Sequence, residues 1–291
     1  MDFAKRANPS YEWRLTSNPE PCWLINTFIQ STNPDEVYIQ SLTTDNYLET
    51  SDYVTNLKET FKDTPNLLRK YLYGDWSLTD SINQLIPSEY LQKAIQRIDY
   101  GVGVSIGIDV ARYGDDKTVF TVLKEGNIEL IESYNQTSIT EVSTRAIELI
   151  NQYNLEPEYL GVDAIGIGAG VVDNLKSAGY NVTEIVGGNK ADETANYGTF
   201  KPYNLRTQIY YELRKDIIDG NLGNLYHEGL RYELQAIKYE ICADKTARVI
   251  SKDVIKRLLG RSPDFADSLA YANYVRTYRG EYYGYVPIYG G

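Results

Sequence analysis

Two short apolar runs in the middle of this chain each end in an aspartate. SIGIDVA carries Asp109 and LGVDAIGIGAG carries Asp163, with glycines close to both acids. Alternation along the first run places its aliphatic residues on one face of a strand. Gly107 and Asp109 lie on the other face, where the glycine is expected to leave open space beside the acid. Acids so far apart in sequence meet when neighbouring parallel strands deliver them to one edge of a sheet. The pattern therefore favours an α/β fold in which these carboxylates converge.

A third aspartate, Asp267, lies in RSPDFADSLAYA, where apolar residues recur with helical spacing. Ser262 is the expected N-cap of this helix and Pro263 its first residue. Asp264 lies three positions before Asp267 and shares its helix face. Because an acid in the first turn also interacts favourably with the helix dipole, capping is the alternative to metal binding for Asp264.

Clustered carboxylates repel each other at neutral pH, so a site formed by Asp109, Asp163 and Asp267 is stable chiefly with cations bound. Oxygen-only ligation selects hard ions, here Mg²⁺ or Mn²⁺. Two such ions, about 3.5 to 4 Å apart, favour phosphodiester hydrolysis because one activates the attacking water and the other stabilises the leaving oxygen. Asp109 is the best candidate to bridge both ions. Asp115 and Asp116 in RYGDDKT most simply form a hairpin turn, and Asp116 could also orient a metal ligand.

Other kinds of site are poorly supported. An aspartate at a strand end can be only a turn former, and the glycine-rich turn after Asp163 could hold a phosphate, although it lacks the Lys-Ser/Thr of a P-loop. His227 is the only histidine, which excludes histidine-rich zinc sites and argues against a Ser-His-Asp triad; it is expected on the surface or at a helix start. Cys22 and Cys242 are far apart without metal-ligand spacing, so both are expected to be reduced.

The net charge of -11 argues against a protein that binds nucleic acid over its whole surface, because phosphate contacts come from Lys and Arg. It does not exclude a nuclease, since acids around metal ions contribute to this charge and a partner can hold the substrate. Some basic residues gather before the third aspartate and others lie further upstream. They are candidate DNA contacts or solvated helix faces: Lys201, Arg206, Lys252, Lys256, Arg257 and Arg261.

The pattern of apolar and polar residues differs between residues 1–97 and residues 98–279. Residues 1–97 combine an expected strand at 36–43 with helical periodicity, and are typical of the end of one domain plus a mostly helical linker. Residues 98–279 alternate apolar runs with amphipathic helices, which predicts a mixed central sheet flanked by helices. Its first three runs predict an antiparallel meander, and the later alternation predicts parallel crossovers. Residues 187–199 are expected to be a mobile loop and the Tyr- and Gly-rich residues 280–291 a flexible tail.

Later elements follow from the same periodicity. Helices are expected over 139–153, 169–178, 204–220 and 229–240, a strand over 247–250, and two helices after it. No apolar stretch approaches the roughly 18 to 20 residues of a membrane-spanning helix, so no membrane association is expected.

Four segments in this order resemble the C-terminal nuclease domain of the large subunit of the tailed-bacteriophage terminase, the DNA-packaging motor. They are GIDVARYGDDKTV, GVDAIGIGAGVVDNL, NLRTQIYYELRKDIIDG and VISKDVIKRLLGRSPDFADSLAYA. Upstream, LTSNPEPCWL is similar to the end of the family's ATPase domain, and SLTTDNYLETSDYVTNLKE with RKYLYGDW to its connecting subdomain. The resemblance covers nearly the whole chain. It implies a ribonuclease H-like fold with Asp109, Asp163 and Asp267 as catalytic metal ligands.

The resemblance also implies a function. It indicates an endonuclease that cuts concatemeric double-stranded DNA in the host cell cytoplasm, at the start and end of genome packaging. The implied partners are the terminase small subunit, the portal protein of the procapsid, and an ATPase domain in the full-length protein or in a separate chain. No GxxxxGK[ST] motif occurs, so ATP hydrolysis is not expected from this chain alone. Two alternatives stay open: a resolvase of Holliday-type junctions, and a non-catalytic module that docks the motor on the portal.

Overall fold

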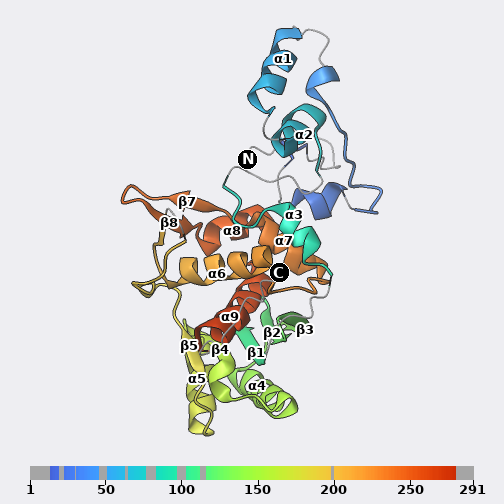
Figure 1. Ribbon diagram of the computed structural model, residues 1–291. Helices are drawn as coiled ribbons and strands as arrows, with labels where there is room; N and C mark the ends of the chain where they lie inside the picture. The colour runs from blue at the N-terminus through green and yellow to red at the C-terminus, as the bar shows by residue number, and fades with distance from the viewer. Residues whose placement is uncertain are drawn as a thin grey trace, which may run out of the picture. The chain divides into compact units, whose positions relative to one another are not determined.

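The computed structural model describes residues 14–19, 23–29, 31–45, 51–62, 65–76, 83–96, 103–111, 116–197 and 200–279 (Figure 1). The chain divides into two compact units, residues 1–81 and 82–291. Residues 83–96, which the sequence analysis grouped with the N-terminal segment, therefore belong to the second unit. The expected tail at 280–291 lies outside the described residues.

The first unit is mostly helical in its described part. Its helices are η1 (Ile25–Ile29, a π-helix), η2 (Thr43–Asp45, a 3-10 helix), α1 (Ser51–Thr60) and α2 (Pro65–Tyr73). The strand expected at 36–43 is wrong, because this segment has no regular structure before η2. Val37 and Ile39 are exposed, and the Asp45 carboxylate accepts a hydrogen bond from the Leu42 N–H at 2.7 Å. The alternating pattern has no partner strand among the described residues, and the chain turns into η2 instead.

A five-stranded mixed sheet forms the centre of the second unit (Figure 1). Its strands are β1 (Val104–Asp109), β2 (Thr118–Lys124), β3 (Asn127–Tyr134), β4 (Leu160–Asp163) and β5 (Thr183–Ile185). The strand order is β3-β2-β1-β4-β5. The β1–β2 and β2–β3 pairs are antiparallel, whereas β1–β4 and β4–β5 are parallel. The predicted meander followed by parallel crossovers is confirmed.

Two helices connect the parallel strands and cover one face of the sheet. Helix α4 (Ile139–Tyr153) leads from β3 to β4, and α5 (Ile167–Ser177) leads from β4 to β5. Helix α4 starts with a capping box between Ser138 and Glu141 and ends at Asn154, which adopts a left-handed φ of 48°. Buried aliphatic side chains from both helices pack with those of β1, β2 and β4 in one core cluster.

The opposite face of the sheet is covered by α9 (Asp264–Arg279). Helix α9 lies directly on β1: a Cβ built on Gly107 would be 2.1 Å from the Ser268 carbonyl oxygen and 2.4 Å from the Ala272 nitrogen. The space that the missing side chain of Gly107 leaves is therefore filled by the backbone of α9. The Ser268 hydroxyl donates to the Gly107 carbonyl at 2.9 Å and so fixes this contact.

Further helices and a small sheet lie on the side of α9 that faces away from the large sheet (Figure 1). The helices are α3 (Ser88–Lys93), α6 (Leu205–Asp219), α7 (Glu228–Ala236) and α8 (Lys252–Leu259). The small sheet has the order β6-β8-β7, with β6 at Lys201–Pro202, β7 at Tyr239–Ile241 and β8 at Thr246–Val249. The helix expected over 229–240 thus ends early, and its last residues form β7. His227 is the N-cap of α7, as its expected place at a helix start suggested.

The segment expected to be a mobile loop is anchored to α6. The Asp192 N–H donates to the Gln208 side-chain oxygen at 2.8 Å, and the Tyr197 ring stacks on Tyr211 with centroids 5.1 Å apart. Residues 198–199 lie outside the described part of the chain. In the described residues no helix is long and apolar enough to span a membrane.

Candidate active site

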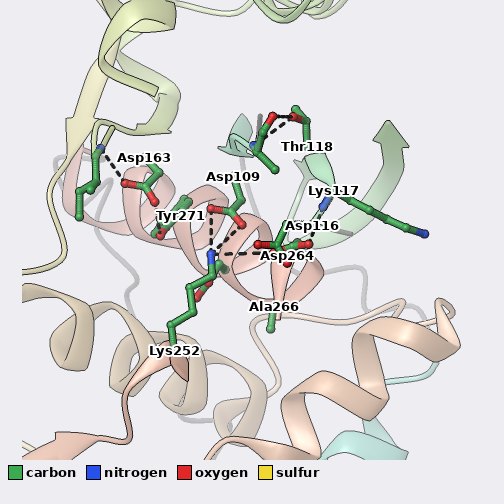
Figure 2. Close-up of polar contacts among 12 residues, drawn as sticks. Asp109, Asp116, Lys117, Thr118, Asp163, Lys252, Asp264, Ala266 and Tyr271 are labelled. Carbon is green, nitrogen blue, oxygen red and sulfur yellow. Dashed lines mark hydrogen bonds and ion pairs between the residues drawn. The ribbon is translucent and has the colours of Figure 1, made fainter. Parts of the chain in front are cut away.

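The three aspartates singled out from the sequence come together at one edge of the large sheet, and Figure 2 labels two of them, Asp109 and Asp163. Asp109 is the last residue of β1 and Asp163 the last residue of the adjacent parallel strand β4. Asp267 lies in the first turn of α9, the helix that packs on β1. The charges of Asp163, Asp264 and Asp267 all act on Asp109. Two strands and one helix thus deliver four carboxylates to a single site.

The centre of this site is occupied by the ammonium group of Lys252, at the start of α8 (Figure 2). Its Nζ lies 3.1 Å from Asp109 Oδ2, 3.0 Å from Asp267 Oδ2 and 3.9 Å from Asp264 Oδ1. Burial disfavours the charged ammonium, but the surrounding carboxylates outweigh it and raise the pKa of Lys252. The sequence placed Lys252 among the candidate DNA contacts; here it is the counter-ion of the acids.

The two most buried acids respond differently to this environment. Burial, together with the neighbouring carboxylates, raises the pKa of Asp109 well above its ordinary value, although Lys252 acts against the shift. Burial also acts to raise the pKa of Asp267, but Lys252, Arg206 and the Tyr210 hydroxyl outweigh it, and the pKa of Asp267 is lowered. The pKa of Asp109 is therefore raised and that of Asp267 lowered, although both carboxyl groups contact the same ammonium.

Asp163 lies to one side of the Lys252 contacts. Its Oδ1 accepts a hydrogen bond from the Ile165 N–H at 3.0 Å, which tightens the turn after β4. The Tyr271 hydroxyl of α9 lies 3.4 Å from Oδ2 and donates to it. Burial first of all raises the pKa of Asp163. Asp163 is thus oriented by its own turn on one oxygen and by α9 on the other.

Asp264 does not serve as a cap of its own helix. Its Oδ2 accepts a hydrogen bond from the Lys117 N–H at 2.7 Å, which ties the start of β2 to α9. Asp116 pairs with the Lys256 ammonium at 2.8 and 2.9 Å, whereas Asp115 lies outside the described residues. An open pocket of about 400 Å³ lies beside these acids. It is lined by Asp109, Val110, Ala111, Asp116, Ile167, Lys252 and Asp264.

Four of the six basic residues proposed as DNA contacts are paired with carboxylates. Lys252 and Arg206 act on the aspartate cluster, Lys256 pairs with Asp116, and Arg261 pairs with the buried Glu233. The other two, Lys201 in β6 and Arg257 in α8, have exposed side chains. The basic residues around Asp267 are therefore, for the most part, turned toward acids of the same protein.

The donor atoms of the site fit a hard divalent cation. All of them are carboxylate oxygens, the kind that Mg²⁺ and Mn²⁺ prefer. Asp267 Oδ2 is buried without a hydrogen bond, and the Lys252 ammonium is its charge partner. Across the described part of the chain, no group of three or more His, Cys, Asp or Glu side chains is arranged as a formed metal site. The carboxylates surround an ammonium instead, so an ion must take over contacts that Lys252 now makes.

No protein-family model matches this chain, and no curated protein matches it. Solved structures do match. The nuclease domain of the large terminase subunit gp2 of bacterial virus Sf6 has a TM-score of 0.54 at 21% identity, over 65% of this chain and 97% of that one. Its K428A mutant with manganese and β-thujaplicinol has a TM-score of 0.52 at the same identity and coverage. A K428A mutant with calcium also has a TM-score of 0.52, over 65% of this chain and 98% of that one. The expected ribonuclease H-like fold, that of terminase nuclease domains, is confirmed.

Proposed function

We propose that this chain is a metal-dependent endonuclease of a viral DNA-packaging terminase, with Asp109, Asp163 and Asp267 as its metal ligands. The observation that carries the proposal is the convergence of acids at the ends of two adjacent parallel strands and at the start of α9, beside the Lys252 ammonium. The fold is that of the Sf6 terminase nuclease domain, whose mutant forms were solved with manganese and with calcium.

Two divalent ions bound here would supply an activated water and a positive charge for the leaving oxygen of a phosphodiester. Asp109, which interacts with Asp163 and with the acids of α9, would contribute to holding both ions. Asp264 would be an additional ligand through Oδ1, since its Oδ2 is engaged by the Lys117 N–H. Asp116 orients Lys256 at the rim of the pocket rather than binding an ion.

We further propose that the substrate is concatemeric double-stranded viral DNA, cut in the host cell cytoplasm when genome packaging starts and ends. The net charge of -11 and the pairing of most nearby basic residues indicate weak DNA binding by this chain alone. Partners that hold the DNA are therefore part of the proposal: the terminase small subunit, the portal protein and an ATPase domain.

The test is cleavage of supercoiled plasmid and linear duplex DNA in Mn²⁺, in Mg²⁺ and in excess EDTA. The expected result is nicking followed by degradation in either metal, with none in EDTA. A faster reaction on four-way junctions than on linear duplex would favour the resolvase. No cleavage in either metal, together with tight binding to a portal protein, would replace the nuclease with the docking module.

Lys252→Met is expected to strengthen Mn²⁺ binding by about tenfold or more. An incoming ion must displace the ammonium from Asp109 and Asp267. The charge-assisted hydrogen bond to Asp109 alone is worth about 1.5 to 3 kcal/mol, and tenfold corresponds to about 1.4 kcal/mol. Titration calorimetry with Mn²⁺ measures the change. Lys215→Met, which removes an exposed pair with Asp219, is the control and should leave the affinity as it is. Unchanged or weaker binding by Lys252→Met would mean that the ammonium and the ion do not compete.

A further inference from the structure

Two residues of α6, Tyr210 and Arg206, contact Asp267. The sequence pattern did not predict either contact. The Tyr210 hydroxyl donates a hydrogen bond to Asp267 Oδ1 at 2.5 Å, and the Arg206 guanidinium lies 3.6 Å from the same oxygen. Tyr210 is fully buried, and the Arg206 guanidinium lies over its ring, 4.9 Å from the centroid. The two side chains are one helical turn apart and share one face of α6.

Arg206 also reaches the chain that leads into Lys252. Its Nη1 donates a hydrogen bond to the Ile250 carbonyl oxygen at 2.9 Å, two residues before Lys252. Its Nη2, the atom nearest Asp267, is buried and makes no hydrogen bond. One guanidinium therefore links the metal-ligand candidate Asp267 to the start of the helix that carries the competing ammonium.

The start of α6 is fixed strongly enough to position these side chains. Asn204 caps the helix by accepting the Thr207 N–H at 3.0 Å. The Arg206 N–H donates to the Gly187 carbonyl oxygen at 2.9 Å, in the segment after β5. The Thr207 hydroxyl accepts the Val249 N–H at 3.2 Å, at the end of β8. Contacts on both sides of its first turn thus prevent α6 from rotating relative to the site.

We propose that Tyr210 and Arg206 are positioning residues that engage Oδ1 of Asp267 and leave Oδ2 alone to bind the ion. This inference rests on the proposed function. Lys252 Nζ lies 3.0 Å from Oδ2, the oxygen that faces the centre of the cluster. A carboxylate engaged on one oxygen presents a single ligand atom in a fixed direction. Without this restraint Asp267 turns about its side-chain torsions, and both oxygens compete for the ion and for Lys252.

The experiment compares Tyr210→Phe with Tyr211→Phe. The first removes only the hydroxyl that contacts Asp267. The second removes the same group from the next residue, whose ring packs on Tyr197 and Tyr239, away from the site. Mutating a residue that hydrogen-bonds to a metal ligand typically lowers metal affinity or activity about 10- to 100-fold. We therefore expect Tyr210→Phe to weaken Mn²⁺ binding by that factor. Tyr211→Phe is expected to bind Mn²⁺ as the parent protein does.

Arg206→Lys and Arg206→Gln extend the comparison. Lysine keeps the positive charge, but it lacks the planar guanidinium that contacts the Ile250 carbonyl and Asp267 at once. We therefore expect Arg206→Lys to bind Mn²⁺ more weakly than the parent protein but more tightly than Arg206→Gln. Unfolding in EDTA is measured for every variant, since a purely structural role would lower stability there and leave the Mn²⁺ dissociation constant unchanged. That result overturns the inference. Raising Mn²⁺ should restore cleavage by Tyr210→Phe, because its defect lies in ion binding.

Binding and cleavage separate the two proposals. A parent protein that binds Mn²⁺ but does not cut DNA contradicts the nuclease, while weaker binding by Tyr210→Phe would still support the positioning role. A parent protein that cuts DNA, with Tyr210→Phe and Arg206→Gln showing the same Mn²⁺ dependence, contradicts the positioning role alone. A parent protein that does not bind Mn²⁺ contradicts both.

Discussion

Asp109→Asn is expected to lower metal-dependent DNA cleavage at least about 100-fold, because loss of a ligand costs more than the 10- to 100-fold typical of the residues that support ligands. Asparagine keeps the volume of the side chain but removes the charge that Asp109 brings to the centre of the cluster. Asp109 lies within the electrostatic reach of Asp163 in β4 and of Asp264 and Asp267 in α9, so its loss affects the whole cluster. Plasmid cleavage in saturating Mn²⁺, followed over time, measures the loss.

Two comparisons make this result specific. Asp173→Asn, on the exposed surface of α5, removes the same charge away from the site and should cleave at the parent rate. Asp109→Ala tests the same loss with the side chain shortened. The two Asp109 variants should retain the circular dichroism spectrum of the parent, since the Lys252 ammonium keeps its ion pair with Asp267 at 3.0 Å. If Asp109→Ala cleaves as fast as the parent protein, the assignment of the catalytic site is wrong.

The positions of Asp109 and Asp163 were predictable because each strand of the sheet is visible in the sequence as a short apolar run. Apolar runs that end in Asp109 and Asp163 define β1 and β4, and the connection through β2, β3 and helix α4 makes the two strands parallel neighbours. The acids then have to lie at the same edge. Asp267 required one more step, since helical spacing places it on a face of α9 but does not say what that face contacts.

The partners of these acids were not predictable in the same way. Lys252 and Arg206 are basic residues near a strand end and a helix start, a pattern that also fits DNA contacts. Their direction is set by long-range packing: α6 and α8 meet the acids only after the small sheet has brought β8 beside the first turn of α6. The short strands β6 and β7 carry too few residues for a periodic signal.

Gly107 shows that sequence does not reveal which element occupies the space a glycine leaves. Alternation places it on the face of Asp109, and a glycine there was expected to leave room beside the acid. The space over Gly107 is taken by the backbone of α9, and Ser268, next to Asp267 in the chain, donates a hydrogen bond to the Gly107 carbonyl oxygen. Sequence alone identifies a missing side chain, but which neighbour uses the space depends on the tertiary fold. The glycine is thus part of how the third carboxylate reaches the first.

Gly107→Ala is therefore expected to destabilise the protein by about 3 kcal/mol, at the upper end of the usual overpacking range, because backbone atoms and not a flexible side chain oppose the new methyl group. Gly188→Ala is the matched control: nothing lies within 4 Å of its Cβ position, so it should change stability by about 1 kcal/mol or less. Urea unfolding of both variants measures the difference. Because α9 must move to admit the methyl group, the folded Gly107→Ala protein should also bind Mn²⁺ more weakly. Equal stability of the two variants would mean that the backbone of α9 lies too far from Gly107 to oppose a methyl group there.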